Sequence, residues 1–222
     1  MRFIGPTSKQ SFCKSCFKEF RAPPYRRIWE KEPLICHDCL SQLKNELSFR
    51  KVEGINVYFL CFYDGIMKQW LMNYKEAGDS ELAPVFFSLY LPLIHLFFPF
   101  SLFVPCPSSQ ERISKRGFDH LPMILEASHL PYRAVLKKGD KEEQKEKKGS
   151  ERFAKKGIGV KEEGKELIGK RIVLFDDVLT TGSTFLQSAS ALQGIGVRSI
   201  SGLILMDNQK LEERRIKGSL FN

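Results

Sequence analysis

Two adjacent carboxylates and a run of hydroxyl side chains stand close together in the last third of the chain. The hydroxyls and a glycine suit a phosphate, because glycine lets the backbone approach an anion and a helix start adds positive potential. The acidic pair would repel phosphate, so it suits the hydroxyls of a sugar beside it, with or without a divalent cation. The predicted ribose and phosphate site comprises Asp176, Asp177, Thr180, Thr181, Gly182, Ser183 and Thr184. A capped helix that binds nothing is the alternative, although capping alone does not require the acidic pair.

Four cysteines fall in two pairs near the N-terminus. The pairs Cys13-x-x-Cys16 and Cys36-x-x-Cys39 are separated by nineteen residues, a spacing typical of a two-knuckle zinc site. We expect Zn²⁺ held by four thiolates, because a region this small and polar cannot fold on an apolar core alone. A redox pair is the alternative, but it needs an exposed pair on a βαβ unit, and both pairs lie outside such a unit.

A strand, a helix and a second strand are expected to position the acidic pair. Residues 171–175 are predicted to be a buried strand, 176–182 a polar turn, 183–193 a helix and 197–206 another strand. Further strands are predicted at 55–63 and 101–105, and further helices at 65–74, at 117–129 and in the apolar run that begins at Leu82. This alternation predicts an α/β fold: a mainly parallel sheet flanked by helices, with ligands bound outside the carboxyl ends of the strands.

Basic side chains follow the predicted strand 101–105, so they can reach the same edge of the sheet as the acidic pair. Because arginine forks bind phosphate oxygens, this segment is a candidate site for a second phosphate group. The candidate residues are Ser108, Ser109, Arg112, Lys115 and Arg116. A solvated basic loop is the alternative. The charged segment 137–156 is also predicted to be a solvated loop, which could close over a ligand.

The chain of 222 residues carries a formal net charge of +9. This charge favours anionic partners, namely phosphates, nucleotides or nucleic acid. Basic and aromatic residues between the cysteine pairs suit single-stranded DNA, and a soluble ribbon that packs on the main domain is an equal alternative. The predicted division is a zinc-ribbon module at 1–50, an α/β domain at 51–207 and a charged tail at 208–222.

The apolar run 82–104 is the stretch that invites a membrane interpretation. Pro84, Pro92, His95 and Pro99 interrupt it, whereas a membrane-spanning helix needs about 20 apolar residues in an unbroken run. We therefore expect a buried helix and a core strand, and no membrane span. Residues 1–10 lack the apolar region of a secretory signal, which favours the cytoplasm.

Several segments resemble known families. Residues 173–184 resemble the phosphoribosyl pyrophosphate signature of type I phosphoribosyltransferases. The stretch 104–119 resembles the PVP…RGFN stretch of the ComF family, whose other elements are matched by Tyr74-Lys75 with Gly78-Asp79 and by Gln144 and Arg152 in its mobile loop. Several positions depart from that pattern: Cys106, Asp119 and His120 stand where Val, Asn and Gln are typical, Lys155 stands where Asn is expected, and the Phe expected a few residues later is missing.

The resemblance carries its own implications. It implies that the acidic pair holds the ribose hydroxyls, that the following loop binds the 5-phosphate, and that the segment from Ser108 to Arg116 binds pyrophosphate, with Mg²⁺ if the enzyme is active. It also implies a ComF-like role in DNA uptake during natural transformation, with the DNA-uptake machinery as partner. An active phosphoribosyltransferase of nucleotide metabolism is the alternative. Its acceptor is unknown, and no residue is predicted to be its general base.

Overall fold

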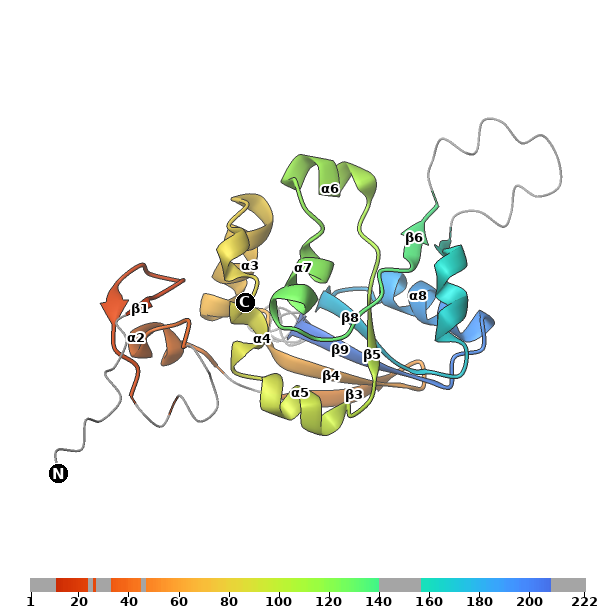
Figure 1. The fold of residues 1–222 in the computed structure, drawn as a ribbon, viewed down its shortest axis with the longest axis horizontal. Coiled ribbons are helices and arrows are strands. Elements are labelled where there is room, and N and C mark those ends of the chain that lie inside the picture. Colours follow the sequence, from red (N-terminus) through yellow and green to blue (C-terminus); the bar gives the residue numbers. More distant parts are fainter. Residues whose placement is uncertain (1–10, 24–25, 27–32, 45–46, 140–156, 209–222) are drawn as a thin grey trace, which may run out of the picture.

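A five-stranded sheet forms the centre of the computed structural model, which describes residues 11–23, 26, 33–44, 47–139 and 157–208. The strand order is β3-β4-β9-β8-β5 (Figure 1). These strands are β3 (Ser48–Val52), β4 (Ile55–Phe62), β9 (Ser199–Asp207), β8 (Arg171–Leu179) and β5 (Leu102–Pro105). β4, β9, β8 and β5 are parallel, and β3 pairs with β4 in the antiparallel sense at one edge. The predicted α/β class with a mainly parallel sheet is confirmed.

The central strands have nearly continuous apolar sequences because both faces of the sheet are covered. In β8, residues 172–175 are each at most 2% exposed. Gly202 of β9 lets a helix approach closely, since a Cβ atom there would lie 2.7 Å from the ring of Phe185 in α8 (Ser183–Gly194). α8 therefore packs directly against the backbone of β9 at Gly202.

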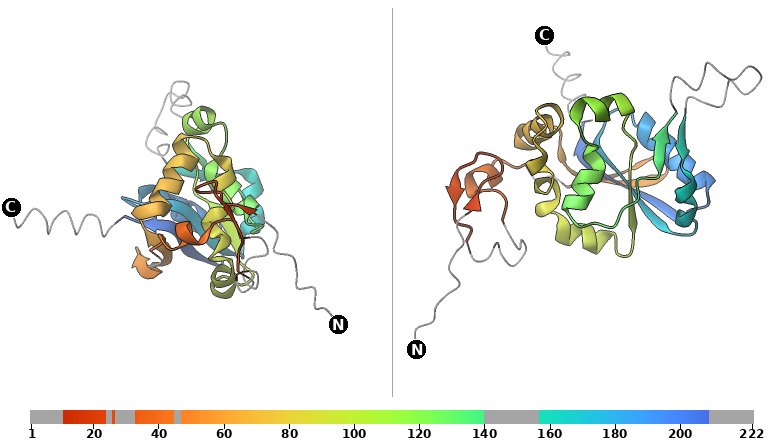
Figure 2. Two further views of the ribbon diagram at one scale, coloured as in Figure 1. Left: turned by 90° about the vertical axis from the view of Figure 1, so that its left-hand side faces the viewer. Right: turned by 45° about the horizontal axis from the view of Figure 1, so that its top comes forward.

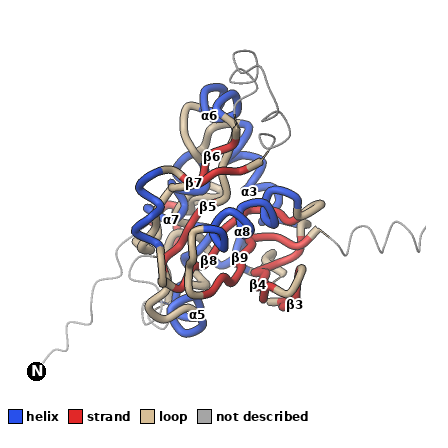
Figure 3. Tube along the Cα trace, turned by 90° about the vertical axis from the view of Figure 1, so that its right-hand side faces the viewer, coloured by secondary structure: helices blue, strands red, loops and turns tan. Residues whose placement is uncertain are grey.

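Different helices cover the two faces (Figure 3). α8 packs on the face that carries Gly202 and its β8 register partner Leu174. Side chains alternate along a strand, so the next residue, Phe175, points to the opposite face, where its ring lies 5.1 Å from that of Phe87 in α4 (Val85–Ser88). α3 (Gly65–Glu76) and α7 (His120–Ala127) pack on the same side as α4, because Lys75 of α3 and His120 of α7 both bind Asp177, which points to the same face as Phe175.

The remaining elements of the domain surround this sheet. They are η1 (Ser80–Leu82), α5 (Leu91–Phe97), α6 (Gln110–Arg116), η4 (Glu162–Leu167) and a ribbon of β6 (Leu136–Lys138) with β7 (Ile158–Val160). The predicted helices 65–74, 117–129 and 183–193 correspond to α3, α7 and α8, and the predicted strands 55–63, 101–105 and 197–206 to β4, β5 and β9. The sequence analysis missed α6, β3 and the β6–β7 ribbon.

The apolar run 82–104 forms two short helices, α4 and α5, and then β5, instead of one helix and a strand. Proline explains the break, because Pro92 lacks the N–H group that a continuous helix would need and sits in the first turn of α5. No single helix among the described residues is long and apolar enough to cross a membrane, although the segments Ser80–Ser88 and Leu91–Phe97, bent by 59°, together meet that length and composition.

The predicted polar turn at 176–182 is wrong in its first half. β8 continues through the acidic pair to Leu179, because Val178 and Leu179 pair with Met206 and Asp207 of β9. The turn proper is confined to residues 180–182, before α8 begins. The acidic pair therefore lies on a rigid strand, with its two side chains on opposite faces of the sheet.

The four-cysteine module lies beside α3, at the opposite end of the molecule from β6 (Figures 1 and 2). Its elements are a short hairpin of β1 (Ser11–Phe12) with β2 (Glu19–Phe20), and α2 (His37–Leu40). Trp70 Nε1 of α3 donates a hydrogen bond of 2.7 Å to Ser15 Oγ, which ties the module to the domain. The boundary predicted at residue 50 falls inside β3.

Candidate functional site

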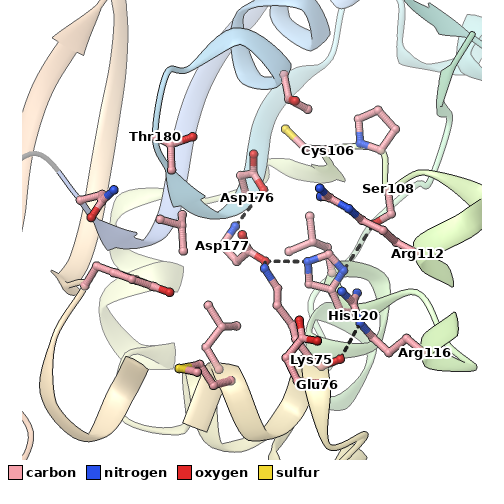
Figure 4. Close-up of a pocket in the computed structure, with 18 of the residues that line it drawn as sticks. Lys75, Glu76, Cys106, Ser108, Arg112, Arg116, His120, Asp176, Asp177 and Thr180 are labelled. Carbon is pink, nitrogen blue, oxygen red and sulfur yellow. Dashed lines mark hydrogen bonds and ion pairs between the residues drawn. The ribbon is translucent and has the colours of Figure 1, made fainter. Parts of the chain in front are cut away.

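A cavity of about 700 Å³ opens at the carboxyl ends of β5 and β8 (Figure 4). Side chains from both faces of the sheet reach it, because α3, α6, α7 and the start of α8 all surround these strand ends. Its polar lining comprises Lys75, Glu76, Cys106, Ser108, Arg112, Arg116, His120, Lys138, Asp176, Asp177, Thr180, Thr184 and Asn208, together with Tyr63. Cations and carboxylates thus face one another across a single space.

Asp177 is bound by two basic side chains in this cavity. Its Oδ2 atom accepts a 2.6 Å hydrogen bond from His120 Nε2 and forms an ion pair with the Lys75 ammonium. Burial raises the pKa of Asp177, but the hydrogen bond from His120 and the charge of Lys75 outweigh it and hold that pKa well below the usual range. Asp177 is therefore ionised throughout the neutral pH range. It is held by side chains of α3 and α7, which cover its face of the sheet.

Asp176 has a different environment, on the face of the sheet where α8 begins. Its Oδ1 accepts a 2.9 Å hydrogen bond from the Asp177 N–H. Burial and then the charge of Asp177 raise the pKa of Asp176 to about 7, because two neighbouring carboxylates cannot both ionise cheaply in a low dielectric. The two aspartates are adjacent in sequence and yet differ in charge near neutral pH.

The residues of the predicted phosphate turn are divided by the structure. Thr180 and Thr184 line the cavity. Gly182 has a φ of 72°, a left-handed conformation that favours glycine, and it caps α8. Thr181 and Ser183 are exposed and do not line the cavity, and Thr181 Oγ1 accepts a 3.4 Å hydrogen bond from the Ser183 N–H.

The predicted pyrophosphate residues are also divided. Ser108, Arg112 and Arg116 line the main cavity, whereas Lys115 lines a neighbouring cavity of about 510 Å³ between α3 and α6, and Ser109 a third beside the β6–β7 ribbon. Arg116 Nε donates a 3.1 Å hydrogen bond to the Lys75 carbonyl oxygen, and its buried Nη1 has no partner among the described residues.

Ser108 is held at the junction of α6 and α7. Its Oγ donates a 2.9 Å hydrogen bond to Asp119 Oδ1 and lies 3.3 Å from His120 Nδ1. His120 therefore bridges the serine of one half of the cavity and Asp177 of the other. The predicted loop residues Gln144 and Arg152 lie outside the described residues.

Sequence reasoning did not assign Lys75, His120 and Lys138 to the site. Lys75 directly follows one predicted helix (65–74), and His120 lies inside another (117–129), so neither shows a local signal of its partner. Lys75 is 102 residues from Asp177 in the chain, and only the packing of α3 beside β8 brings them together. The resemblance to the ComF family did single out both positions, without a role.

The four cysteines form a compact cluster whose sulfur atoms all lie within 4.8 Å of one another. The distances are 3.8 Å between Cys13 and Cys39 and 3.7 Å between Cys16 and Cys36. A tetrahedral site with metal–sulfur bonds of about 2.3 Å has sulfur–sulfur edges of about 3.8 Å. The donor set and its spacing therefore fit a metal ion such as zinc.

Comparison with known proteins gives two curated relatives of similar extent. The chain is 30% identical over 179 residues to the competence protein ComFC of Bacillus subtilis strain 168, covering 78% of this chain and 72% of the relative. It is 28% identical over 178 residues to the competence protein ComFC of Streptococcus pneumoniae, covering 77% and 74%. No protein-family model matches the chain.

Solved phosphoribosyltransferases show weaker similarity. Adenine phosphoribosyl transferase from Trypanosoma brucei, in complex with AMP, pyrophosphate and ribose-5-phosphate, has a TM-score of 0.41 and 15% identity over 74% of this chain and 88% of that one. APRTase from Giardia lamblia, complexed with 9-deazaadenine, has a TM-score of 0.37 and 17% identity over 82% and 90%. These scores are too low to add to the fold described above.

Proposed function

The chain belongs to the ComF family, and from this premise we propose that it is a competence protein whose cavity binds the phosphoribosyl group of phosphoribosyl pyrophosphate or a related nucleotide. We place the protein in the cytoplasm, where cysteine thiolates stay reduced and available to a metal. It assigns ribose and 5-phosphate binding to β8 and the turn that follows it, and pyrophosphate binding to the segment between β5 and α6.

The shared cavity at the strand ends carries this proposal. Asp176, Thr180 and Thr184 lie on one side of it, and Ser108, Arg112 and Arg116 on the other, so one ligand could contact both sets. Carboxylates suit sugar hydroxyls, and arginines suit phosphate oxygens. A volume of about 700 Å³ is also ample for a phosphorylated sugar, since ligand cavities of about 300–1,000 Å³ are usual.

Calorimetric titration with ribose 5-phosphate and with phosphoribosyl pyrophosphate tests this assignment. We expect Thr184→Val to weaken both ligands at least about tenfold, because it removes a hydroxyl from the cavity and keeps the shape of the side chain. Ser190→Ala, an exposed change on the same helix, is the matched control and should leave binding unaltered. Equal affinity of the wild type and Thr184→Val would refute the assignment of this turn to the phosphate.

We also propose that the four-cysteine module contacts single-stranded DNA. Phe12 and Phe17 are 68% and 70% exposed, and Lys18 and Arg21 are exposed on the same module. Exposed aromatic rings beside cations suit stacking on bases and pairing with phosphates. The rest of the predicted basic and aromatic set between the knuckles lies largely outside the described residues, while Arg26 is buried against the Ile35 carbonyl.

The salt dependence of DNA affinity separates this contact from a purely structural module. Phe17→Ala should weaken binding of a single-stranded oligonucleotide about fivefold to a hundredfold at every salt concentration, because it removes one stacking surface. Lys18→Gln should lower the slope of log affinity against log salt. Full affinity in both variants would exclude the module as a DNA surface.

A further inference from the structure

Lys75 is the cation placed closest to the acidic pair. It comes from the last turn of α3, and its ammonium pairs with the Asp177 Oδ2 atom while its side chain remains 22% exposed. The side chain lines both the main cavity and the neighbouring one of about 510 Å³. Its charge is therefore anchored by a buried carboxylate and still faces the space that would hold a phosphorylated sugar.

A divalent cation does not fit this arrangement of donors. Mg²⁺ is usually bound through one or two carboxylates and the phosphates of a substrate, and those carboxylates must offer unprotected oxygens. Here one oxygen of each carboxylate is already occupied, because Asp177 Oδ2 accepts from His120 and Lys75 and Asp176 Oδ1 accepts from a backbone N–H, so at most the second oxygen of each remains for an ion. An ion bound to this pair would stand beside an ammonium group.

The wider charge balance of the cavity points the same way. Arg112, Arg116 and Lys138 line it together with Lys75, against three carboxylates, those of Glu76, Asp176 and Asp177. The raised pKa of Asp176 removes part of that negative charge near neutral pH, because the acid is then partly protonated. A further divalent cation would enter a space that already contains more fixed positive than negative charge.

We propose that the Lys75 ammonium, anchored on Asp177, supplies the positive charge that Mg²⁺ would otherwise supply to a sugar-phosphate ligand, so that this cavity binds its ligand without a divalent cation. The inference rests on the proposed function and departs from the Mg²⁺ that the family resemblance implies. Lys75 acts here as a binding residue: its ammonium is held in place by Asp177 and contacts oxygen atoms of the ligand, and no bond is made or broken through it.

Titration of phosphoribosyl pyrophosphate into the full chain, once in EDTA and once in Mg²⁺, tests the inference. Exposure to EDTA is kept brief, and the zinc content is measured afterwards, so that loss of zinc from the module can be excluded. We expect the two dissociation constants of the wild type to agree within about threefold. A gain of tenfold or more with Mg²⁺ would overturn the inference, whereas the absence of heat in both conditions would overturn the proposed function as well.

The variant Lys75→Gln provides an independent readout. It should weaken binding in EDTA at least about tenfold, because a charge-assisted contact is lost, and it should make binding depend on Mg²⁺, because Asp177 then becomes available to the ion. Lys165→Gln removes an equivalent lysine from an exposed pair with Glu162 and is the matched control. Unchanged affinity of Lys75→Gln in EDTA would also contradict the inference, and if that variant fails to fold, the wild-type comparison still decides.

Discussion

The four-cysteine module and the rim of the sheet both concentrate reactive groups, but they are stabilised in different ways. Among the described residues of the module, three of the four thiols belong to the few buried side chains, and Ile35 is the largest buried apolar one. The sheet rim instead rests on strands whose apolar residues are almost completely buried. A region with so little buried apolar surface among its described residues would depend on a bound metal for its stability, whereas a region above a large core can retain an unfavourable charge for binding.

We expect removal of a metal bound by the four cysteines to have the largest effect of these changes. It should show most clearly that the module and the sheet are stabilised in different ways. Structural zinc contributes about 10–16 kcal/mol to small metal-dependent modules, so chelation or Cys36→Ser should unfold residues 33–44 and leave the sheet folded. Hydrogen exchange followed by mass spectrometry checks this, with loss of protection in the module and unchanged protection in β8 and β9. Unchanged protection of the module in zinc-free protein would contradict the account.

Loss of the Asp177 carboxylate should have the second largest effect on the free energy of unfolding. Asp177→Asn leaves the Lys75 and His120 side chains without their buried anion, and breaking such a pair costs about 3–5 kcal/mol. Urea denaturation should show this loss in the transition of the sheet domain. Thr184→Val, at the same rim, should change stability by less than about 1 kcal/mol. A loss no larger than that of Thr184→Val would mean that the ion pair contributes little.

Removal of the Asp176 carboxylate should instead stabilise the protein at alkaline pH, with a smaller effect on the free energy of unfolding. The pKa of Asp176 is raised from its ordinary value of 3.8 to about 7, so the stability linked to its proton is fully present below about pH 4 and is lost progressively as the pH rises to about 7. Asp176→Asn removes that loss. The variant should gain about 2–3 kcal/mol over the wild type at pH 8 relative to pH 5, while binding the sugar phosphate more weakly. An equal difference at both pH values would contradict the coupling between the two aspartates.

The same strand shows what the sequence can and cannot predict. The buried run before the acidic pair, the helix after it and the parallel strand at 199–207 follow from apolar periodicity, and all three were predicted. The extension of β8 through residues 176–179 was not. Asp and Thr indicate a turn in the local sequence, whereas pairing with β9 across a long separation decides the conformation.

The residues of the candidate site also differ in whether the sequence could predict them. Residues close to one another in sequence, such as the two aspartates and the threonines behind them, could be grouped by their chemistry alone. Lys75 and His120 could not be assigned roles, because their partner Asp177 is brought to them by the packing of α3 and α7 against β8. Lys115 shows the reverse case: it neighbours Arg116 in sequence and yet lines the neighbouring cavity and not the main one.

A crystal structure of the protein soaked with ribose 5-phosphate tests the central claim most directly. The account predicts density for the sugar beside Asp176 and for the phosphate beside Thr180 and Thr184, inside the cavity at the ends of β5 and β8. Density at another surface, or an empty cavity at saturating ligand, would contradict it.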